Sequence, residues 1–298
     1  MSQDKYSREE KRPISTSAVI RLVIWSVALC ILVGVFSAAM LLDGGGLHFY
    51  LYDDFDDDGD GGNYSVGNGA VSAAVSEISI NWVAGSVTVL LTDGDEIRIT
   101  EDYDGDNNDN RLRWRVDDGE LSIRYCRKIR HSDKVEAKNL TVEIPRSAAP
   151  LSELQITTVS ATQDIRVSAR ELDIETVSGG VTALGDYDSV DAETVSGDVN
   201  FEGYFRIGSF EGASGNLELH LTKQAAELDV DTVSGRTRLV LPEDTTGFSV
   251  DRESVSGRAE VNGFSFDSVG SGRWGDGSMD IRLESVSGNL VIERETGN

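Results

Sequence analysis

The 298-residue chain has few of the residues on which small stapled folds and metal sites depend. Two cysteines and three histidines exclude a disulfide-stapled scaffold and a four-cysteine zinc site. Four prolines beside 31 glycines exclude collagen and an ordinary proline-rich linker. Basic residues are also scarce, 27 against 52 acidic ones, and the formal charge of −25 argues against nucleic acid or an anionic lipid surface as the main partner.

The motifs of common enzyme classes are missing as well. His48, His131 and His220 are far apart and lack the spacing of zinc ligands or of a catalytic histidine site. The chain contains neither a G-x-S-x-G nucleophile motif nor a P-loop. We therefore expect no catalytic residues, no cofactor and no enzymatic activity.

One long apolar run is present, Leu22–Leu42, and it carries no charge. As a helix it would span about 32 Å, enough for the ~30 Å hydrocarbon core of a bilayer. Basic residues dominate its N-terminal side and aspartates follow its C-terminal side, which predicts a single-pass anchor with residues 1–21 in the cytoplasm and 43–298 outside the cell membrane. A cleaved signal peptide, cut near residues 37–39, is the alternative, and either arrangement exports the rest of the chain.

The most informative feature is a repeat that begins after residue 150. A Thr-Val-Ser-Gly-like tetrapeptide occurs seven times, with serines spaced 18, 18, 18, 20, 22 and 31 residues apart. The serines are Ser160, Ser178, Ser196, Ser214, Ser234, Ser256 and Ser287. A period of about 20 residues is typical of a solenoid. Seven equivalent serines at one corner are better explained as turn formers than as nucleophiles.

Apolar residues alternate with polar ones on both sides of each Ser-Gly corner. Positions six and four before the serine, and five after it, are mostly Leu, Ile, Val, Ala or Phe. A period of two predicts two short strands per coil, joined by a bend at the glycine. Stacked coils would place equivalent residues about 4.8 Å apart and join the apolar positions into one core. The predicted fold class is all-β: a single-chain β-solenoid, parallel β-helix-like, with coils of about 18–22 residues after one N-terminal transmembrane helix.

An acidic residue stands three positions before the serine in six of the seven coils. This acidic ladder consists of Glu175, Glu193, Glu211, Asp231, Glu253 and Glu284. Like charges on neighbouring strands repel each other. We interpret the ladder as a solvated face that opposes aggregation. The alternative is a surface for divalent cations or polycations, which would relieve the repulsion.

The chain before the repeat divides into two parts. Residues 43–75 are rich in glycine and aspartate and are predicted to form a flexible stalk. Strand-like segments then occupy 76–82, 86–91, 96–101, 112–116, 121–126 and 140–144. We expect 76–298 to be one β domain, in which an irregular part, 76–150, caps the regular coils of 151–298. Cys126 ends one of these segments and is expected to be buried, with no disulfide partner at Cys30 inside the membrane run.

Residues 76–298 resemble a known bacterial family. The resemblance rests on Ile78-x-Ile80 followed by Gly85-x-Val87-x-Val89, on Leu140–Pro145, and on the Thr-Val-Ser-Gly coils from 158 to 288. The chain is similar here to the putative-adhesin β-strand-repeat family, a domain family of unknown function that often carries a membrane helix ahead of the repeat. The resemblance implies a single-chain β-solenoid at the cell envelope, in some cases linked to envelope stress, and it supplies no active-site pattern.

Three groups of residues outside the ladder are candidates for binding. Asp54, Asp56, Asp58 and Asp60 match the first half of a calcium loop, but Ser65 stands in place of its final glutamate, so a charged linker with at most weak calcium binding is expected. A basic region between 111 and 138 includes Arg124, Arg127, Lys128 and Arg130. It is interpreted as internal charge balance, or alternatively as a contact for an envelope protein or wall polymer. Arg273 and Trp274, in the longest spacing, form either a recognition anchor or packing over the end of the core.

The function predicted from these features is a non-enzymatic, membrane-anchored extracytoplasmic protein that acts as an adhesin-like, scaffold or envelope-stress accessory module. Two alternatives stay open. The first is a solenoid enzyme that acts on cell-wall or host polysaccharide, and the second is a filament former whose coil ends stack between chains. The sequence does not indicate an oligomeric state, and no nucleic-acid partner is expected.

Overall fold

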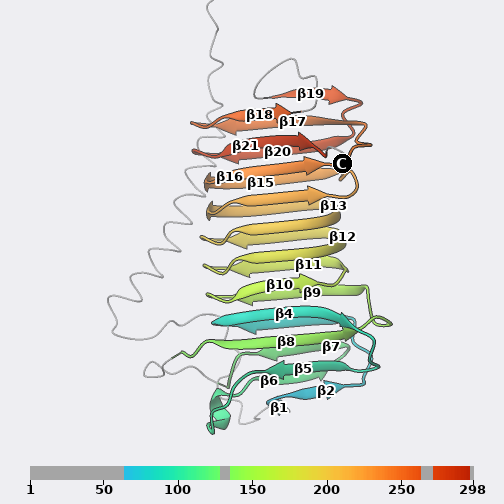
Figure 1. The fold of residues 1–298 in the computed structure, drawn as a ribbon, viewed down its shortest axis with the longest axis vertical. Helices are drawn as coiled ribbons and strands as arrows, with labels where there is room; N and C mark the ends of the chain where they lie inside the picture. The colour runs from blue at the N-terminus through green and yellow to red at the C-terminus, as the bar shows by residue number, and fades with distance from the viewer. Residues whose placement is uncertain (1–63, 128–134, 263–270, 296–298) are drawn as a thin grey trace, which may run out of the picture.

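The computed structural model describes residues 64–127, 135–262 and 271–295 (Figure 1). Over these ranges the chain is built of strands, with one short 3-10 helix, η2 (Asn108–Asn110). Among the described residues no helix is long and apolar enough to cross a membrane, and the run Leu22–Leu42 lies outside them. The all-β class predicted from the alternating pattern is confirmed.

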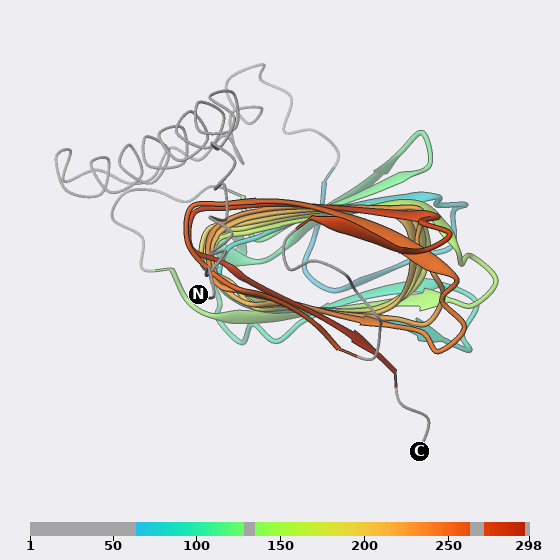
Figure 2. The ribbon, with the colours of Figure 1, turned by 90° about the horizontal axis from the view of Figure 1, so that it is seen from above.

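The strands stack in two faces, so that each coil is a flattened loop with two long sides (Figure 2). In spatial order face A holds β1 (Ser65–Val66), β6 (Arg113–Asp117), β7 (Glu120–Arg124), β3 (Glu77–Trp82), β9 (Leu151–Thr158), β11 (Ala169–Thr176), the second halves of β12 (Val181–Thr194) and β13 (Val199–Ser214), β15 (Glu227–Ser234), β20 (Met279–Ser285), β17 (Gly247–Ser254) and β19 (Gly272–Gly275). Face B holds β2 (Gly69–Val71), β5 (Ile97–Glu101), β8 (Lys138–Pro145), β4 (Gly85–Thr92), β10 (Thr162–Arg166), the first halves of β12 and β13, β14 (Leu217–Leu221), β16 (Arg236–Leu241), β21 (Asn289–Arg294) and β18 (Ala259–Asn262).

The core lies between the two faces and consists of columns of equivalent side chains. On face A one column joins Leu154, Leu172, Val190, Gly208, Leu228, Ile281 and Val250. Leu172 and Ile174 are buried in β11, whereas Glu171 and Glu175, one position away, are exposed. This alternation is the period of two read from the sequence, and burial of one side of every strand holds the register of the stack.

The repeated serines bond the corners of neighbouring coils together. The Oγ atoms of all seven serines donate a hydrogen bond to a main-chain carbonyl of the adjacent coil, at 3.2–3.4 Å. Ser178 shows the pattern, since both its amide and its hydroxyl donate to the carbonyl of Val159. The structure therefore agrees with their interpretation as turn formers.

The coils do not stack in chain order. The last coil, β20–β21, lies between β15–β16 and β17–β18, although it follows both in the sequence (Figure 1). At the other end, β3–β4 lies between β7–β8 and β9–β10. Antiparallel strands terminate both ends of face A, β6 with β1 at one end and β19 at the other.

Arg252 explains why β17–β18 is the end coil. It occupies the inward column that holds Val230 and Leu283 in the two preceding coils of the stack. Its Nε and Nη2 atoms are buried without a hydrogen-bond partner among the described residues, and this burial lowers its pKa. If coils packed against both sides of β17–β18, the guanidinium would be buried further, which costs free energy. A coil that carries Arg252 is therefore more stable at the end of the stack than inside it.

The strand segments predicted between 76 and 144 match β3 to β8 within two residues at each end. The predicted stalk is wrong for residues 64–75. These residues include β1 and β2, which pair with β6 and β5, and Val71 and Val75 are buried against the core. Glycine and aspartate dominate the segment before them, so the prediction from composition extended the stalk too far. It missed a short stretch of alternating apolar residues that packs on the apolar core.

Candidate functional site

The outward side of face A carries acidic side chains on every strand from β9 to β17. From β9 to β17, the outward positions carry Glu153, Glu171, Asp173, Glu175, Asp191, Glu193, Glu211, Glu227, Asp229, Asp231, Asp280, Glu284, Asp251 and Glu253. Among these described strands, Arg282 is the basic side chain that lies in register with the acidic residues, and it pairs with Asp229 at 3.2 Å; Arg170 is exposed near the start of β11. We call this surface the acidic face.

The acidic ladder predicted from the sequence is one column of this acidic face. Glu175, Glu193, Glu211 and Asp231 are direct neighbours in register, and Glu284 lies between Asp231 and Glu253. The last two members are therefore in the reverse of their sequence order, because β20 lies between β15 and β17. Toward the other end the column continues as Thr157, Asn81 and Arg124.

Close packing of like charges perturbs the carboxyl groups of this face. Burial among neighbouring side chains raises the pKa of Asp173, Asp191, Glu193 and Glu211. The largest effect is at Asp231, whose pKa rises to about 6 because it is partly desolvated and faces Glu284 and Asp229, while Arg282 acts in the opposite direction. The face thus holds charges that would be more stable protonated or paired with a cation.

The stability of the protein is expected to increase as the pH falls from 8 to about 5.5. A carboxyl whose pKa is higher in the folded state than in the unfolded chain binds its proton first in the folded state, so acidification through about pH 6 favours folding. Because Asp231 also reaches solvent, its share is about 1 kcal/mol. Thermal melts at the two pH values test this, and Asp231→Asn should melt higher at pH 8 and show a smaller difference. An equal pH effect in the variant would assign the dependence to other groups.

Face B differs from the acidic face in its charge pattern. Arg238 donates to Glu293 at 2.8 Å and also to Glu218, so three charges of both signs lie side by side. Arg98 of β5 pairs with Glu143 of the neighbouring strand β8, and Arg166 pairs with Asp164 on its own strand, β10. Opposite charges on neighbouring strands stabilise the sheet, whereas the acidic face has like charges there.

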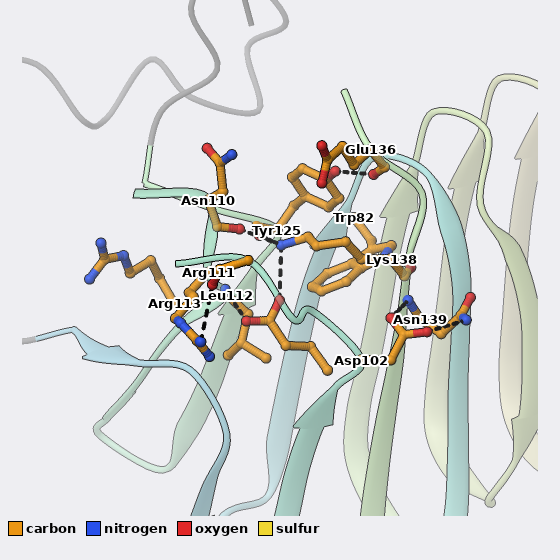
Figure 3. Close-up of polar contacts among 12 residues, drawn as sticks. Trp82, Asp102, Asn110, Arg111, Leu112, Arg113, Tyr125, Glu136, Lys138 and Asn139 are labelled. Carbon is orange, nitrogen blue, oxygen red and sulfur yellow. Dashed lines mark hydrogen bonds and ion pairs between the residues drawn. The ribbon is translucent and has the colours of Figure 1, made fainter. Parts of the chain in front are cut away.

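A second cluster lies inside the N-terminal part of the stack, around Lys138 (Figure 3). The ammonium group of Lys138 donates to Glu101 Oε2 at 2.9 Å, to the carbonyl of Asn110 at 2.7 Å and to the carbonyl of Tyr125. It also lies 4.0 Å from the ring centroid of Tyr125 and 5.0 Å from that of Trp82. The Lys138 and Glu101 side chains are 2% and 0% exposed, so the pair is fully desolvated.

The cluster joins four elements of the N-terminal cap. Glu101 ends β5, Lys138 begins β8, Asn110 belongs to η2 and Tyr125 follows β7. Burial lowers the pKa of Lys138, whereas the hydrogen bond and charge of Glu101 oppose this. Three acceptors satisfy the three N–H groups of the ammonium, so we interpret the pair as a structural clamp and not as a nucleophile.

Lys138 is the last residue of the basic region between 111 and 138, and neither it nor Glu101 was predicted to be a site residue. Their positions in the alternation carried the missing signal. Lys138 has the same parity as the buried residues Leu140, Val142 and Ile144, and Glu101 has the parity of Ile97 and Ile99. A charged residue on the inward parity of a strand must find a buried partner, so two such residues predict a pair.

The described residues of the basic region make local contacts. Arg124 and Arg115 lie over the ring of Tyr64 at 5.2 and 5.0 Å, and Arg127 pairs with Asp109 at 3.3 Å. Arg113 donates to the carbonyl of Asn108. Lys128 and Arg130 lie outside the described residues. These contacts leave open whether an envelope protein or wall polymer also binds here, which stays a prediction.

Trp274 belongs to β19 and lies at the end of the stack. Its ring centroid is 5.7 Å from that of Phe248, and the guanidinium of Arg294 lies 5.3 Å from it. It is half-buried and packs on the core cluster, whereas Arg273 is exposed and donates to the carbonyl of Asp276. Of the two roles predicted for Trp274, packing over the core end is the one these contacts favour.

The remaining predictions concern metal ions and cysteine. Asp54, Asp56, Asp58 and Asp60 lie outside the described residues, and within residues 64–127, 135–262 and 271–295 no group of three or more His, Cys, Asp or Glu side chains is arranged to hold a metal ion. Cys126 is 2% exposed, as the sequence predicted.

Comparisons with known proteins place the chain in a family. Similar solved structures include a putative adhesin from Bacteroides fragilis (16% identity, 78% of this chain and 97% of that chain, TM-score 0.43) and a putative cell adhesion protein from Clostridium sporogenes (11%, 78% and 100%, TM-score 0.30). A third is a putative lipid binding protein from Parabacteroides distasonis (13%, 79% and 98%, TM-score 0.36). No curated protein matches the chain. The model of the Toastrack domain, DUF4097, matches residues 96–293, which is more than half of the sequence, and the chain therefore belongs to the Toastrack DUF4097 family, a family of the kind its repeated coils predicted.

Proposed function

We propose that the protein is a non-enzymatic, adhesin-like module of the cell envelope, held at the membrane by the apolar run 22–42. The observation that carries the proposal is the use of the repeated polar residues. Each of the seven corner serines bonds a neighbouring coil, so the repeat uses its hydroxyl groups for structure, and the two long faces of the stack remain for contact with other molecules. Membership of the Toastrack family is consistent with this role.

The proposal is tested with the full-length chain produced in bacterial cells. Protease added to intact cells should remove the C-terminal domain and spare an epitope tag at the N-terminus. Cells that display the chain should adhere to immobilised wall polymer or envelope proteins more than cells without it. Release of reducing sugar from wall or host polysaccharide by the purified chain, lost on substitution of a single polar residue, would instead support the solenoid enzyme.

The acidic face gives a second measurable property. Replacing Glu175, Glu193 and Glu211 together by glutamine removes like-charge repulsion, so the variant should melt higher by a few degrees at pH 8. It should also self-associate more, because the charges that oppose aggregation are gone. Sedimentation at increasing protein concentration measures the association.

The matched control is a variant with the same change in net charge, made by three Glu→Gln substitutions outside the acidic face. Glu202, Glu243 and Glu260 are exposed acidic residues away from the acidic face, and their triple glutamine variant should change neither property as much. If millimolar calcium raises the melting temperature of the native chain more than sodium of equal ionic strength does, and the acidic-face variant loses this response, the cation-binding alternative is supported over a purely solvated face.

The filament alternative receives less support from the ends of the stack. The terminal strands of face A, β1 and β19, contain two and four residues, and both pair antiparallel to their neighbours. Short edge strands of this kind are a common means of preventing edge-to-edge association.

A further inference from the structure

The C-terminal coil separates two coils that are consecutive in the sequence. On face A, β20 pairs in parallel with β15 on one side and with β17 on the other. On face B, β21 pairs in the same way with β16 and β18. Both strands of the last coil therefore lie inside the stack, between coils that were completed earlier along the chain (Figure 1).

The two flanking coils have the same register with respect to this insert. Asp280 faces Glu227 of β15 and Ser249 of β17, and two residues further on, Arg282 faces Asp229 and Asp251. On face B, Ile292 faces Leu239 of β16 and Val261 of β18 in the same manner. If the insert were absent, β15–β16 and β17–β18 would meet in register on both faces, with every inward position still inward.

The connection between the flanking coils also permits direct contact. Residues 242–246, which link β16 to β17, are five in number, as are residues 222–226, which link β14 to β15. The link 222–226 leads from one coil to the next in the stack, whereas the link 242–246, of the same length, passes over the inserted coil to the one beyond it. The two links already touch, since Gln224 donates to the carbonyl of Gly247 at 2.9 Å and accepts from the amide of Thr246 at 2.9 Å.

If β15–β16 and β17–β18 closed on each other, the ends of the stack would also remain unchanged. Coil β17–β18 would remain the last coil, so the guanidinium of Arg252 would stay at the end of its column, and β19 would still pair with β17. The insert itself is strongly apolar on its inner side. Met279, Ile281, Leu283, Leu290 and Ile292 are at most 2% exposed, so outside the slot the coil would expose a continuous apolar surface that favours its return.

We propose that β20–β21 is an exchangeable insert. The slot between β15–β16 and β17–β18 accepts a two-strand coil with the sequence pattern of residues 279–294, and the flanking coils close on each other when no coil occupies it. The recognition combines main-chain pairing on both edges of each strand with the apolar inward positions, which is the chemistry of strand addition to a sheet. The partner defined by this chemistry is the C-terminal coil itself, whether from the same chain or from a second copy.

Disulfide crosslinking tests the closure. Glu227 and Ser249 are separated by two strand spacings, about 9.6 Å, which is too far for a disulfide, whereas closure would bring them to about 4.8 Å. In the full-length chain with Cys30 and Cys126 replaced by alanine, E227C/S249C should not crosslink and E227C/D280C should. In the same chain ended after residue 277, E227C/S249C should crosslink and the chain should still unfold cooperatively. A truncated chain that is unfolded, or folded without the 227–249 crosslink, overturns the proposal.

A peptide tests whether the slot reopens. A synthetic peptide of residues 276–295 added to the truncated E227C/S249C chain under reducing conditions should suppress the crosslink on later oxidation. The same peptide with Ile281→Asp and Leu283→Asp should not, because its inward side chains are charged. Equal crosslinking with and without the unmodified peptide would show that the slot does not accept a coil in trans, and would overturn exchange.

Hydrogen exchange on the unmodified full-length chain gives an independent measurement that needs no variant. An exchangeable insert predicts that the amides of β20 and β21 exchange together, while β15, β16 and β17 remain protected. A stack that unravels from its end predicts that β17–β19 exchange first. Protection lost from β17–β19 before β20–β21 would overturn the proposal.

Discussion

Replacing Gly235 by alanine is expected to lower the free energy of unfolding by about 3–4 kcal/mol. Gly235 is the glycine of a Ser-Gly corner and has a φ angle of 137°, a conformation that residues with a side chain rarely adopt. A Cβ atom there would lie 2.0 Å from the carbonyl oxygen of Gly215 in the neighbouring coil. The clash is between main chains that are held by strand pairing, so neither can move aside without loss of hydrogen bonds. Urea unfolding followed by circular dichroism measures the change.

Gly212 supplies the matched control for this prediction. It occupies the threonine position of the preceding corner, residues 212–215, and a Cβ atom there would lie 3.4 Å from Thr194 Cγ2, which is close to ordinary contact. A hollow of about 30 Å³ lies beside it, lined also by Thr194 and Thr232. Gly212→Ala should therefore be neutral or should stabilise the protein by up to about 1 kcal/mol. Equal destabilisation by the two substitutions would contradict the close-approach explanation of the corner glycines.

Replacing Lys138 by methionine should cost about 3–5 kcal/mol of stability. The substitution preserves most of the side-chain volume but leaves the carboxylate of Glu101 buried without its cation. Glu101 would retain only the hydrogen bond that its Oε1 accepts from the amide of Leu112. The carbonyls of Asn110 and Tyr125 would also lose their donor. Chemical denaturation gives the free energy, and near-ultraviolet circular dichroism follows the environment of Trp82 and Tyr125.

Two further variants separate the buried charge from the lost packing. Adding Glu101→Gln to Lys138→Met removes the unpaired carboxylate, so the double variant should be more stable than Lys138→Met alone. Arg146→Met breaks an exposed ion pair, with Asp93, and should cost less than about 1 kcal/mol. If Lys138→Met were as mild as Arg146→Met, the cluster would not be the clamp that its burial indicates.

Local sequence patterns predicted much of the fold. Alternation around each Ser-Gly corner placed Leu172 and Ile174 inside and Glu175 outside, as observed. It also placed the strands between 76 and 144 close to their observed bounds. These predictions succeeded because the side a side chain faces depends on its own parity and on its burial, both of which are local. The acidic ladder followed from the same reasoning, since residues at one position of every coil form one column.

The residues that the sequence analysis misplaced are those whose partners lie far away in the chain. Lys138 was grouped with the basic region between 111 and 138 although its parity is inward, and Glu101, 37 residues earlier, is its counter-charge. Val71 lies in a stretch predicted to be a stalk, but it is buried because β2 pairs with β5. Arg252 stands at an inward position of its strand, and this position could have indicated the end coil from the sequence. An inward charged group can reach toward solvent only at an end of the stack.

The scarcity of cysteine, histidine and basic residues, the seven corners and the alternation determined by themselves that this is an acidic all-β repeat protein with charged outer columns. Tertiary structure alone decided which coil lies against which, and which charges are buried. The reason is that every coil presents nearly the same edge in the same register, so local sequence cannot rank the pairings. The choice depends on differences summed over whole coils: the apolar inner side of β20–β21 inside the stack, Arg252 at its end, and the Lys138–Glu101 pair that closes the opposite cap.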